Sequence, residues 1–492
     1  MPEIRKEKIS GKREARNKLN LLLLPAIGLS LLAALLAVAL ISYKFPYGKA
    51  GNQMPVMALV VLLMVAGLVY LLLLKVRPAG MPARKTLAYI FFAGVAMRLI
   101  LLPSHTILED DIYRYLWDGA VVSHLVNPYR YSPEEILKME TSGPEPPALL
   151  PLLARQSGDV AKRINHPHLR SIYPMTVQLF FGLAHWLRPW SIFVWRALLL
   201  VMDILNFILL MELLRKIKWP ASLAVFYWWN PLLIFETFNG NHMDILIFPF
   251  LLGAFLVSAE GWALAAGLLL ALAGAAKVWP VLLLPFFIKY FRRFPARKTV
   301  TFISAFLIGS ALLYSPLFAA FASNNSGFLA YGRQWELNDA LFKIFVWGSR
   351  AILPLFGLHP GYAQQTARIV ALLLVTLITL WLLWRRQMER PEQLISAAFF
   401  TVAVVFIVSP TQFPWYFIWL APFLVFNRNF AIMLLTLLLP LYFLRYYFAA
   451  IGRPGVFDNG VVWLEFVPVW LLLIKDFWRR RQGANVLPKV TV

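Results

Sequence analysis

Three consecutive carboxylates, Glu109, Asp110 and Asp111, are the strongest candidates for chemistry in this sequence. Neighbouring acids repel one another, which can raise the pKa of one of them toward that of a general base. If the following residues form a helix, Arg114 and Asp118 lie on the same face as Asp111. The cluster is therefore either a general base with an adjacent cation or a solvated helix start, where acids are favoured by the helix dipole.

A second set of polar and aromatic side chains lies at breaks between apolar stretches. The set comprises Tyr113, Tyr129, Arg130, His166, Tyr173, Glu236, His242, Asp244, Trp335, Trp415 and Tyr416. These side chains either line a binding site or have plainer roles: a loop histidine is usually hydrogen-bonded, and Trp and Tyr gather at membrane interfaces without further function. Glu236 lies near a membrane boundary, where an ionisable group is costly and usually has a partner.

Lys277 lies between two apolar half-spans and is followed closely by Pro280, which breaks a helix. A lysine in this place can bind a phosphate group as a point charge. It can equally extend its ammonium group to the membrane surface and have no ligand. The sequence leaves both interpretations open.

Membrane helices are the expected framework for these residues. Of 492 residues, 60% are hydrophobic and only 14% are charged, which excludes a soluble globular protein and a disordered chain. Apolar stretches of about 20 residues recur, and they predict about 12 to 14 membrane spans. Because the chain has no cysteine, disulfides, thiolate catalysis and cysteine-bound zinc are excluded.

The positions of Lys and Arg predict how the chain crosses the membrane. When the spans alternate, most of the net charge of +23 falls on one side, which is expected to be cytoplasmic, with both termini on it. The charge therefore reflects topology, and nucleic acid is not an expected partner. Almost all polar motifs fall on the outer side, which favours an enzyme working at that face over a lipid-linked sugar transporter or flippase without catalysis.

We expect four parts along the chain. A basic cytoplasmic tail, 1–18, precedes two extra N-terminal transmembrane helices in 19–85, which can lie at the periphery of the core. A membrane domain, 86–475, contains a long outer loop, 104–174, and a second outer loop, 319–341. A cytoplasmic tail, 476–492, follows. All of this predicts an all-α integral membrane protein, a polytopic helical bundle.

The order of motifs resembles bacterial glycosyltransferase family 87, a group of C-type, polytopic glycosyltransferases. The motifs are Asp111-Ile-Tyr-Arg-Tyr-Leu-Trp-Asp-Gly119, Asn127-Pro-Tyr-Arg-Tyr131, Asn165-His-Pro167 and Ile172-Tyr-Pro174, and the resemblance covers roughly 86–475. It implies a bundle of membrane helices with interfacial helices in the first large outer loop. It also implies transfer of a hexose, typically mannose, from a polyprenyl-phosphate donor to a hydroxyl of a lipid or glycan acceptor at the outer face of the plasma membrane.

The resemblance also implies roles for individual residues. The catalytic base matches Asp111, with Asp110 as the adjacent alternative, and a single base without a covalent nucleophile predicts inversion at the anomeric carbon. Candidates to bind the donor phosphate are Lys277, Arg114, Arg130 and His242. Although the acidic cluster could hold a divalent ion, the resemblance implies metal-independent transfer, and neither a metal nor another cofactor is expected.

Overall fold

The computed structural model describes residues 2–46, 53–76, 83–140, 143, 147–318, 327, 332 and 335–481, and side chains from Leu22 to Arg479 within these ranges. Two predicted parts lie largely outside the described residues. They are the second outer loop, 319–341, of which most of 319–334 is not described, and the tail 476–492. The described residues form an all-helical fold with no β-strand; a single bridge pairs Leu337 with Thr411. The predicted fold class, a polytopic helical membrane protein, is confirmed.

The helices follow one another in three groups. The first group is α1 (Pro2–Ser42), α2 (Gln53–Leu71) and α3 (Ala83–Leu101), and the long outer loop adds α4 (Asp111–Ser123), α5 (Pro133–Leu137), α6 (Leu149–Gln156) and α7 (Met175–Leu187). The second group is α8 (Ile192–Lys216), α9 (Val225–Trp228), α10 (Pro231–Phe238), α11 (Phe248–Ala259), α12 (Ala263–Gly274), α13 (Leu284–Phe291) and α14 (Ala296–Tyr314). The third is α17 (Ala340–Ile352), α18 (Ala363–Arg385), α19 (Pro391–Val408), α20 (Phe430–Leu438), α21 (Leu444–Ala450), α22 (Pro454–Val456) and α23 (Val462–Arg481).

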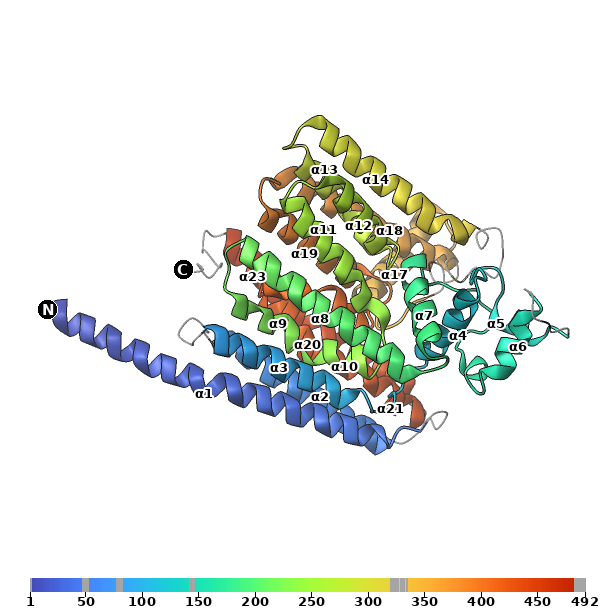
Figure 1. Ribbon diagram of the computed structural model, residues 1–492, viewed down its shortest axis with the longest axis horizontal. Coiled ribbons are helices and arrows are strands. Elements are labelled where there is room, and N and C mark those ends of the chain that lie inside the picture. The colour runs from blue at the N-terminus through green and yellow to red at the C-terminus, as the bar shows by residue number, and fades with distance from the viewer. Residues whose placement is uncertain are drawn as a thin grey trace.

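Short 3₁₀ helices join several of these elements and carry site residues. They include η5 (Met243–Ile247), η6 (Trp279–Leu283), η10 (Pro414–Trp419), η11 (Ala421–Val425) and η12 (Leu439–Phe443). In Figure 1 the long helices run side by side, with the start of α1 and the end of α23 at one end of the bundle. The helices α4, α5 and α6 of the segment 104–174 lie at the opposite end.

Fewer helices are long enough to cross a bilayer than the sequence leads one to expect. Eight described helices are long and apolar enough, and the bent pair of Pro231–Phe238 and Met243–Ala259 would be a ninth. The difference from 12 to 14 has a local cause, since proline opens or follows many short pieces. Pro231 and Pro422 each break an apolar stretch that hydropathy alone would count as one span, and Pro280 opens a piece too short to cross a bilayer.

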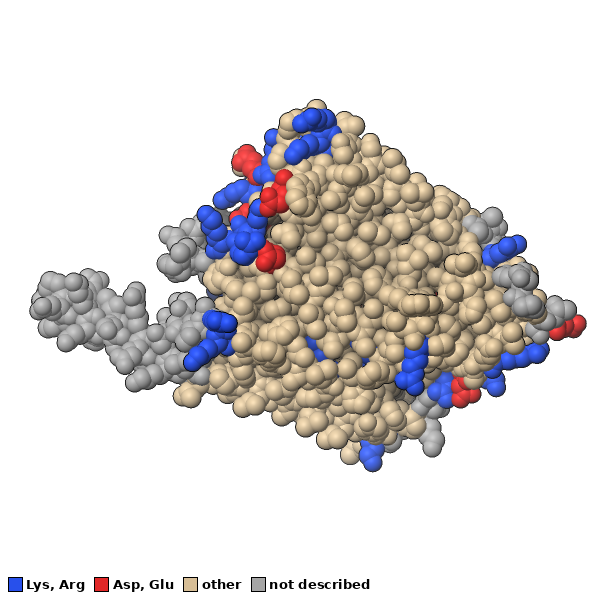
Figure 2. Space-filling model, viewed as in Figure 1, with Lys and Arg blue, Asp and Glu red and all other residues tan. Residues whose placement is uncertain are grey.

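The surface agrees with a protein embedded in lipid. Figure 2 shows a broad face almost free of charged side chains between two charged ends, with Lys and Arg concentrated at the end where α13 meets α14. Inside the bundle, Arg98 pairs with Asp203 at 2.6 Å, and both side chains are fully buried. These two charged groups are thus paired with each other and do not face lipid, as their cost in a membrane predicts.

The two N-terminal helices pack directly onto the bundle. Tyr70 of α2 donates a hydrogen bond to the carbonyl of Phe226, and Gly67 lets α2 approach the backbone of Leu437 closely. At the outer end of α1, Ser42 accepts a hydrogen bond from the backbone N–H of His105. The hairpin therefore contacts the segment that leads to the acidic cluster.

Candidate active site

The outer loop places two carboxylates at the start of α4. Asp111 is the first residue of the helix and Asp110 precedes it at the N-cap position, so the cluster stands at a helix start, where carboxylates are favoured. The side-chain amide of Asn165 donates hydrogen bonds of 2.8 Å to both Asp110 and Asp111. One amide thus holds the two carboxylates in a fixed relation.

Burial raises the pKa of the Asp111 carboxyl to about 6, and its repulsion by Asp110 adds to this. The hydrogen bond from Asn165 and the charge of Lys277 act in the opposite direction. The pKa of Asp110 is also raised, again chiefly by burial. The sequence predicts a raised pKa from repulsion between acids, but the main cause is removal of the carboxylates from water.

Arg114 lies on the same face as Asp111 but is bonded elsewhere. Its Nε donates to Asp118 at 2.9 Å, and its Nη1 donates to the carbonyl of Leu169 at 3.0 Å. Asp118 also accepts hydrogen bonds from Ser171 and from Gln178 of α7. This buried network fixes α4 against the loop that carries Tyr173, while the buried Nη2 of Arg114 has no hydrogen-bond partner among the described residues.

Lys277 follows α12, and its ammonium group lies 3.0 Å from Oδ1 of Asp244, in η5. The same carboxylate oxygen accepts a hydrogen bond of 2.7 Å from the indole of Trp419. The ammonium group also lies 4.8 Å from the ring centre of Tyr416, within range of a cation–π contact. Lys277 is therefore held over the site by three groups, and its side chain is only 21% exposed.

Aromatic rings form a further part of the site. Trp415 stacks between His242 and Phe413, with both ring centres 4.2 Å away. Trp335 contacts His166 edge-to-face at 4.7 Å, which brings the second outer loop onto the first. Flat rings in such numbers can contact the apolar faces of a sugar.

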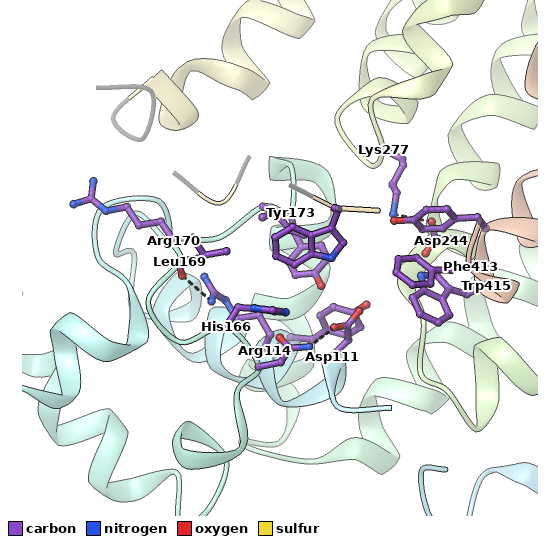
Figure 3. Close-up of a pocket in the computed structure, with 15 residues that line it drawn as sticks. Asp111, Arg114, His166, Leu169, Arg170, Tyr173, Asp244, Lys277, Phe413 and Trp415 are labelled. Atoms are coloured by element: carbon purple, nitrogen blue, oxygen red, sulfur yellow. Dashed lines mark hydrogen bonds and ion pairs between the residues drawn. The ribbon is translucent and has the colours of Figure 1, made fainter. Parts of the chain in front are cut away.

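These groups surround one cavity of about 110 Å³ that is open to the outside. Figure 3 shows Asp111, Arg114 and His166 on one side, with Lys277, Asp244 and Trp415 facing them from the other. The lining residues are Asp111, Arg114, Tyr115, Asn165, His166, Leu169, Arg170, Ile172, Tyr173, Asp244, Lys277, Trp335, Phe413, Trp415 and Tyr416. The first outer loop and the membrane bundle thus supply opposite walls.

Nine of the residues predicted from the sequence line this cavity: Asp111, Arg114, His166, Tyr173, Asp244, Lys277, Trp335, Trp415 and Tyr416. Six others lie outside its lining. Asp110 shares Asn165 with Asp111, His242 stacks behind Trp415, and Glu236 lies 3.6 Å from His242.

The remaining three are also accounted for by contacts beyond the cavity. Tyr113 accepts a hydrogen bond from Arg163, Tyr129 donates one to the carbonyl of Tyr173, and Arg130 is exposed over the ring of Tyr131. The cavity also includes residues absent from the predicted set, notably Asn165 and Phe413. Asn165 belongs to the motif Asn165-His-Pro167, which the sequence already shows. The signal that could have identified it is the pair of adjacent carboxylates, Asp110 and Asp111, because they need a common hydrogen-bond donor.

No group of three or more His, Asp or Glu side chains in the described part of the chain is arranged to hold a metal ion. The chemistry that the described residues can perform is proton transfer at Asp111 and binding of a negative charge near Lys277.

A bundle of apolar helices with a polar, aromatic cavity at one end defines a polytopic membrane protein with an enzyme-like site. Residues 172–410, just under half of the chain, match glycosyltransferase family 87. The match confirms the resemblance found from the motifs and supports a membrane glycosyltransferase. The match starts at Ile172 and so includes the part that carries Lys277 and Asp244 but not α4. No curated protein and no solved structure matches the chain.

Proposed function

We propose that this glycosyltransferase moves a hexose, with mannose as the first choice, from a polyprenyl-phosphate donor to a hydroxyl of a lipid or glycan acceptor. The reaction takes place at the outer face of the plasma membrane, both chain termini lie in the cytoplasm, and the anomeric carbon is inverted. The observation that carries the proposal is that Asp111 and Lys277 face the same cavity from opposite walls.

Asp111 is the proposed general base. A carboxylate with a pKa of about 6 is mostly ionised at neutral pH, yet it accepts a proton more readily than an ordinary aspartate. As the acceptor oxygen bonds to the anomeric carbon, its proton passes to Asp111, and the bond from that carbon to the phosphate oxygen breaks. Asp111 is preferred to Asp110 because only Asp111 lines the cavity.

Lys277 is the proposed partner of the leaving phosphate. The departing polyprenyl phosphate gains negative charge in the transition state, and an ammonium group fixed nearby stabilises that charge. Asp244 and Trp419 fix the ammonium group before the donor binds, which reduces the entropy that would otherwise be lost. Trp335, Trp415 and Tyr416 line the cavity and are the proposed contacts of the sugar, with Trp415 offering a ring edge because His242 and Phe413 cover its two faces.

The test is transfer by purified protein from a labelled polyprenyl-phosphate mannose to a panel of lipid and glycan acceptors. We expect a glycosylated product with inverted anomeric configuration, which NMR of the product determines. Absence of transfer to every acceptor, or retention of configuration, would contradict the proposal.

A matched pair of variants tests the base. We expect Asp111→Asn to lower turnover by about 10²–10⁴-fold, the usual range for a general base, while the protein still folds. Asp110→Asn, which changes the neighbouring carboxylate on the same Asn165, should retain most of the activity. The assignment of Asp111 fails if the two variants are equally impaired or if Asp111→Asn turns over at the wild-type rate.

A further inference from the structure

The segment between the end of α3 and the acidic cluster, residues 101–107, is bonded to three buried polar side chains. They are Arg196 of α8 and two asparagines that follow α10, Asn239 and Asn241. All three side chains are almost completely inaccessible to water. We call these three residues the polar hub.

Arg196 makes the largest number of contacts in the polar hub. Its guanidinium group donates to the carbonyls of Leu101, Leu102, Ser104 and Asn239, to the hydroxyl of Thr106 and to the side-chain oxygen of Asn241. All six acceptors are neutral oxygens, and four of them belong to the segment 101–107. One arginine therefore fixes the path of this segment at four points.

Asn239 holds the same segment further along. Its side-chain oxygen accepts from the backbone N–H of Ile107 at 3.1 Å, and its amide donates to the Ser104 hydroxyl at 2.9 Å and the His105 carbonyl at 2.7 Å. The last residue that it holds, Ile107, comes four positions before Asp111. This leaves only a short stretch of chain between the hub and the proposed base.

Asn241 connects the hub to the opposite wall of the cavity. Its backbone is left-handed, with φ of +66°, a conformation that asparagine tolerates better than most residues. Its amide donates to Thr106 at 2.9 Å and to the Asn239 carbonyl at 2.8 Å, which stabilises the tight turn. His242 follows directly, and Asp244, the partner of Lys277, comes two residues later.

We propose that Arg196, Asn239 and Asn241 are positioning residues for catalysis, because they fix Asp111 on one wall against the Asp244–Lys277 pair on the other. The two walls come from chain segments more than 100 residues apart. The hub hydrogen-bonds to residues 101–107, which lead to Asp111, and two of its members, Asn239 and Asn241, belong to the turn that leads to Asp244. A displacement of about 1 Å between reacting groups can cost about 10²-fold in rate. This inference rests on the proposed role of Asp111 as base.

The first test compares Asn239→Ala with Asn230→Ala. Asn230 is an equally buried asparagine whose side chain makes two hydrogen bonds, with Leu233 and Thr436, against three at Asn239, and neither of the two involves residues 101–107. With labelled polyprenyl-phosphate mannose as the probe, we expect Asn239→Ala to lower kcat by about 10–100-fold and leave the donor KM within about twofold. Asn230→Ala should leave kcat near the wild-type value. Equal loss of kcat in both variants, or a loss confined to KM, would overturn the proposal.

The second test makes a smaller change that keeps the fold. Thr106→Val removes the hydroxyl that accepts from Arg196 and Asn241 but preserves side-chain shape, whereas Thr106→Ser keeps the hydroxyl. We expect Thr106→Val to lower kcat by about 2–10-fold, since one buried hydrogen-bond acceptor is lost, and Thr106→Ser to restore it. Wild-type kcat in Thr106→Val would overturn the proposal even if Asn239→Ala failed to fold.

Asp111→Asn, measured in parallel, separates this inference from the proposed function. If Asp111→Asn keeps its activity, the base assignment fails, and the positioning role fails with it. If Asp111→Asn is inactive while Asn239→Ala behaves like Asn230→Ala, only the positioning role fails.

Discussion

The pH dependence of transfer is the sharpest test of the site, because Asp111 must be ionised to accept a proton. With a pKa of about 6, roughly 97% of Asp111 is ionised at pH 7.5 but only about 9% at pH 5. An aspartate with the ordinary pKa of 3.8 would still be about 94% ionised at pH 5. We therefore expect the rate to fall about tenfold between pH 7.5 and pH 5, where an ordinary aspartate would give almost no change.

Two variants should move this acid limb in opposite directions. Asp110 raises the pKa of Asp111 by repulsion, so Asp110→Asn should lower that pKa and shift the limb to lower pH. Lys277 lowers the pKa of Asp111 by attraction, so Lys277→Ala should shift the limb to higher pH. Opposite shifts from two neighbouring charges would identify Asp111 as the group that titrates.

The donor should add a further shift. A polyprenyl-phosphate sugar is a phosphodiester whose single negative charge persists across this pH range, and its binding near Lys277 brings that charge into the cavity. An added anion disfavours ionisation of a nearby carboxyl. Since kcat reports the enzyme–substrate complex and kcat/KM the free enzyme, the limb of kcat should lie at higher pH than that of kcat/KM.

The assay is the initial rate of transfer from pH 5 to pH 8, with donor and acceptor varied at each pH. Protein held at pH 5 and then assayed at pH 7.5 controls for irreversible inactivation. A profile that stays flat down to pH 5, or a shift to higher pH in Asp110→Asn, would refute the role of Asp111.

Three further outcomes are expected. Lys277→Ala should raise the donor KM by about 10–100-fold, the usual value of a charge-assisted bond, while Arg130→Ala, outside the cavity, should change it less than about twofold; equal effects would contradict the role of Lys277. Transfer should proceed at the full rate in excess chelator, and a loss that added Mg²⁺ restores would show that a metal is required. Gly67→Ala should lower the melting temperature, at a cost of about 1–3 kcal/mol, because a Cβ would lie 2.7 Å from the backbone of Leu437. Gly348→Ala, with nothing within 4 Å of the added Cβ, should not lower it.

Local spacing in the sequence predicts the start of α4 well. The expected helix begins at Asp111, and Arg114 and Asp118 lie on one face and bond to each other, as positions four apart do on a helix. The same spacing could not show that Arg114 also donates to the carbonyl of Leu169, which is far from it in the sequence. Whether a cation is paired or available depends on the folded loop. Arg114 lines the cavity and its Nη2 has no hydrogen-bond partner among the described residues, so its role as a phosphate ligand stays a prediction.

Hydropathy identifies the apolar stretches but not their breaks. The apolar stretch 415–427, one of those that hydropathy counts as a span, contains Pro422 and forms two 3₁₀ helices, η10 and η11. These are too short to cross a bilayer, and η10 brings Trp415 and Tyr416 to the cavity. Proline removes a helical hydrogen bond without lowering the mean hydropathy of a segment much, so the break is invisible to a sliding average. The residues that a broken span turns inward are among those that line the site.

The central geometry of the site could not be read from the sequence, because it depends on pairs far apart in the chain. Asp244 and Lys277 appear in separate motifs, and each has a plausible solitary role, in a turn or at the membrane surface. Their separation of 3.0 Å fixes the ammonium group beside the cavity, where it has a carboxylate partner. Two other residues likewise bond to segments far from them in the sequence. Asn165 donates to residues 110–111, and Arg196 donates to the turn at 239–241. Charged side chains in a membrane protein usually pair with one another, so ion pairs of this type are expected from the sequence. Only the fold determines which residues form them.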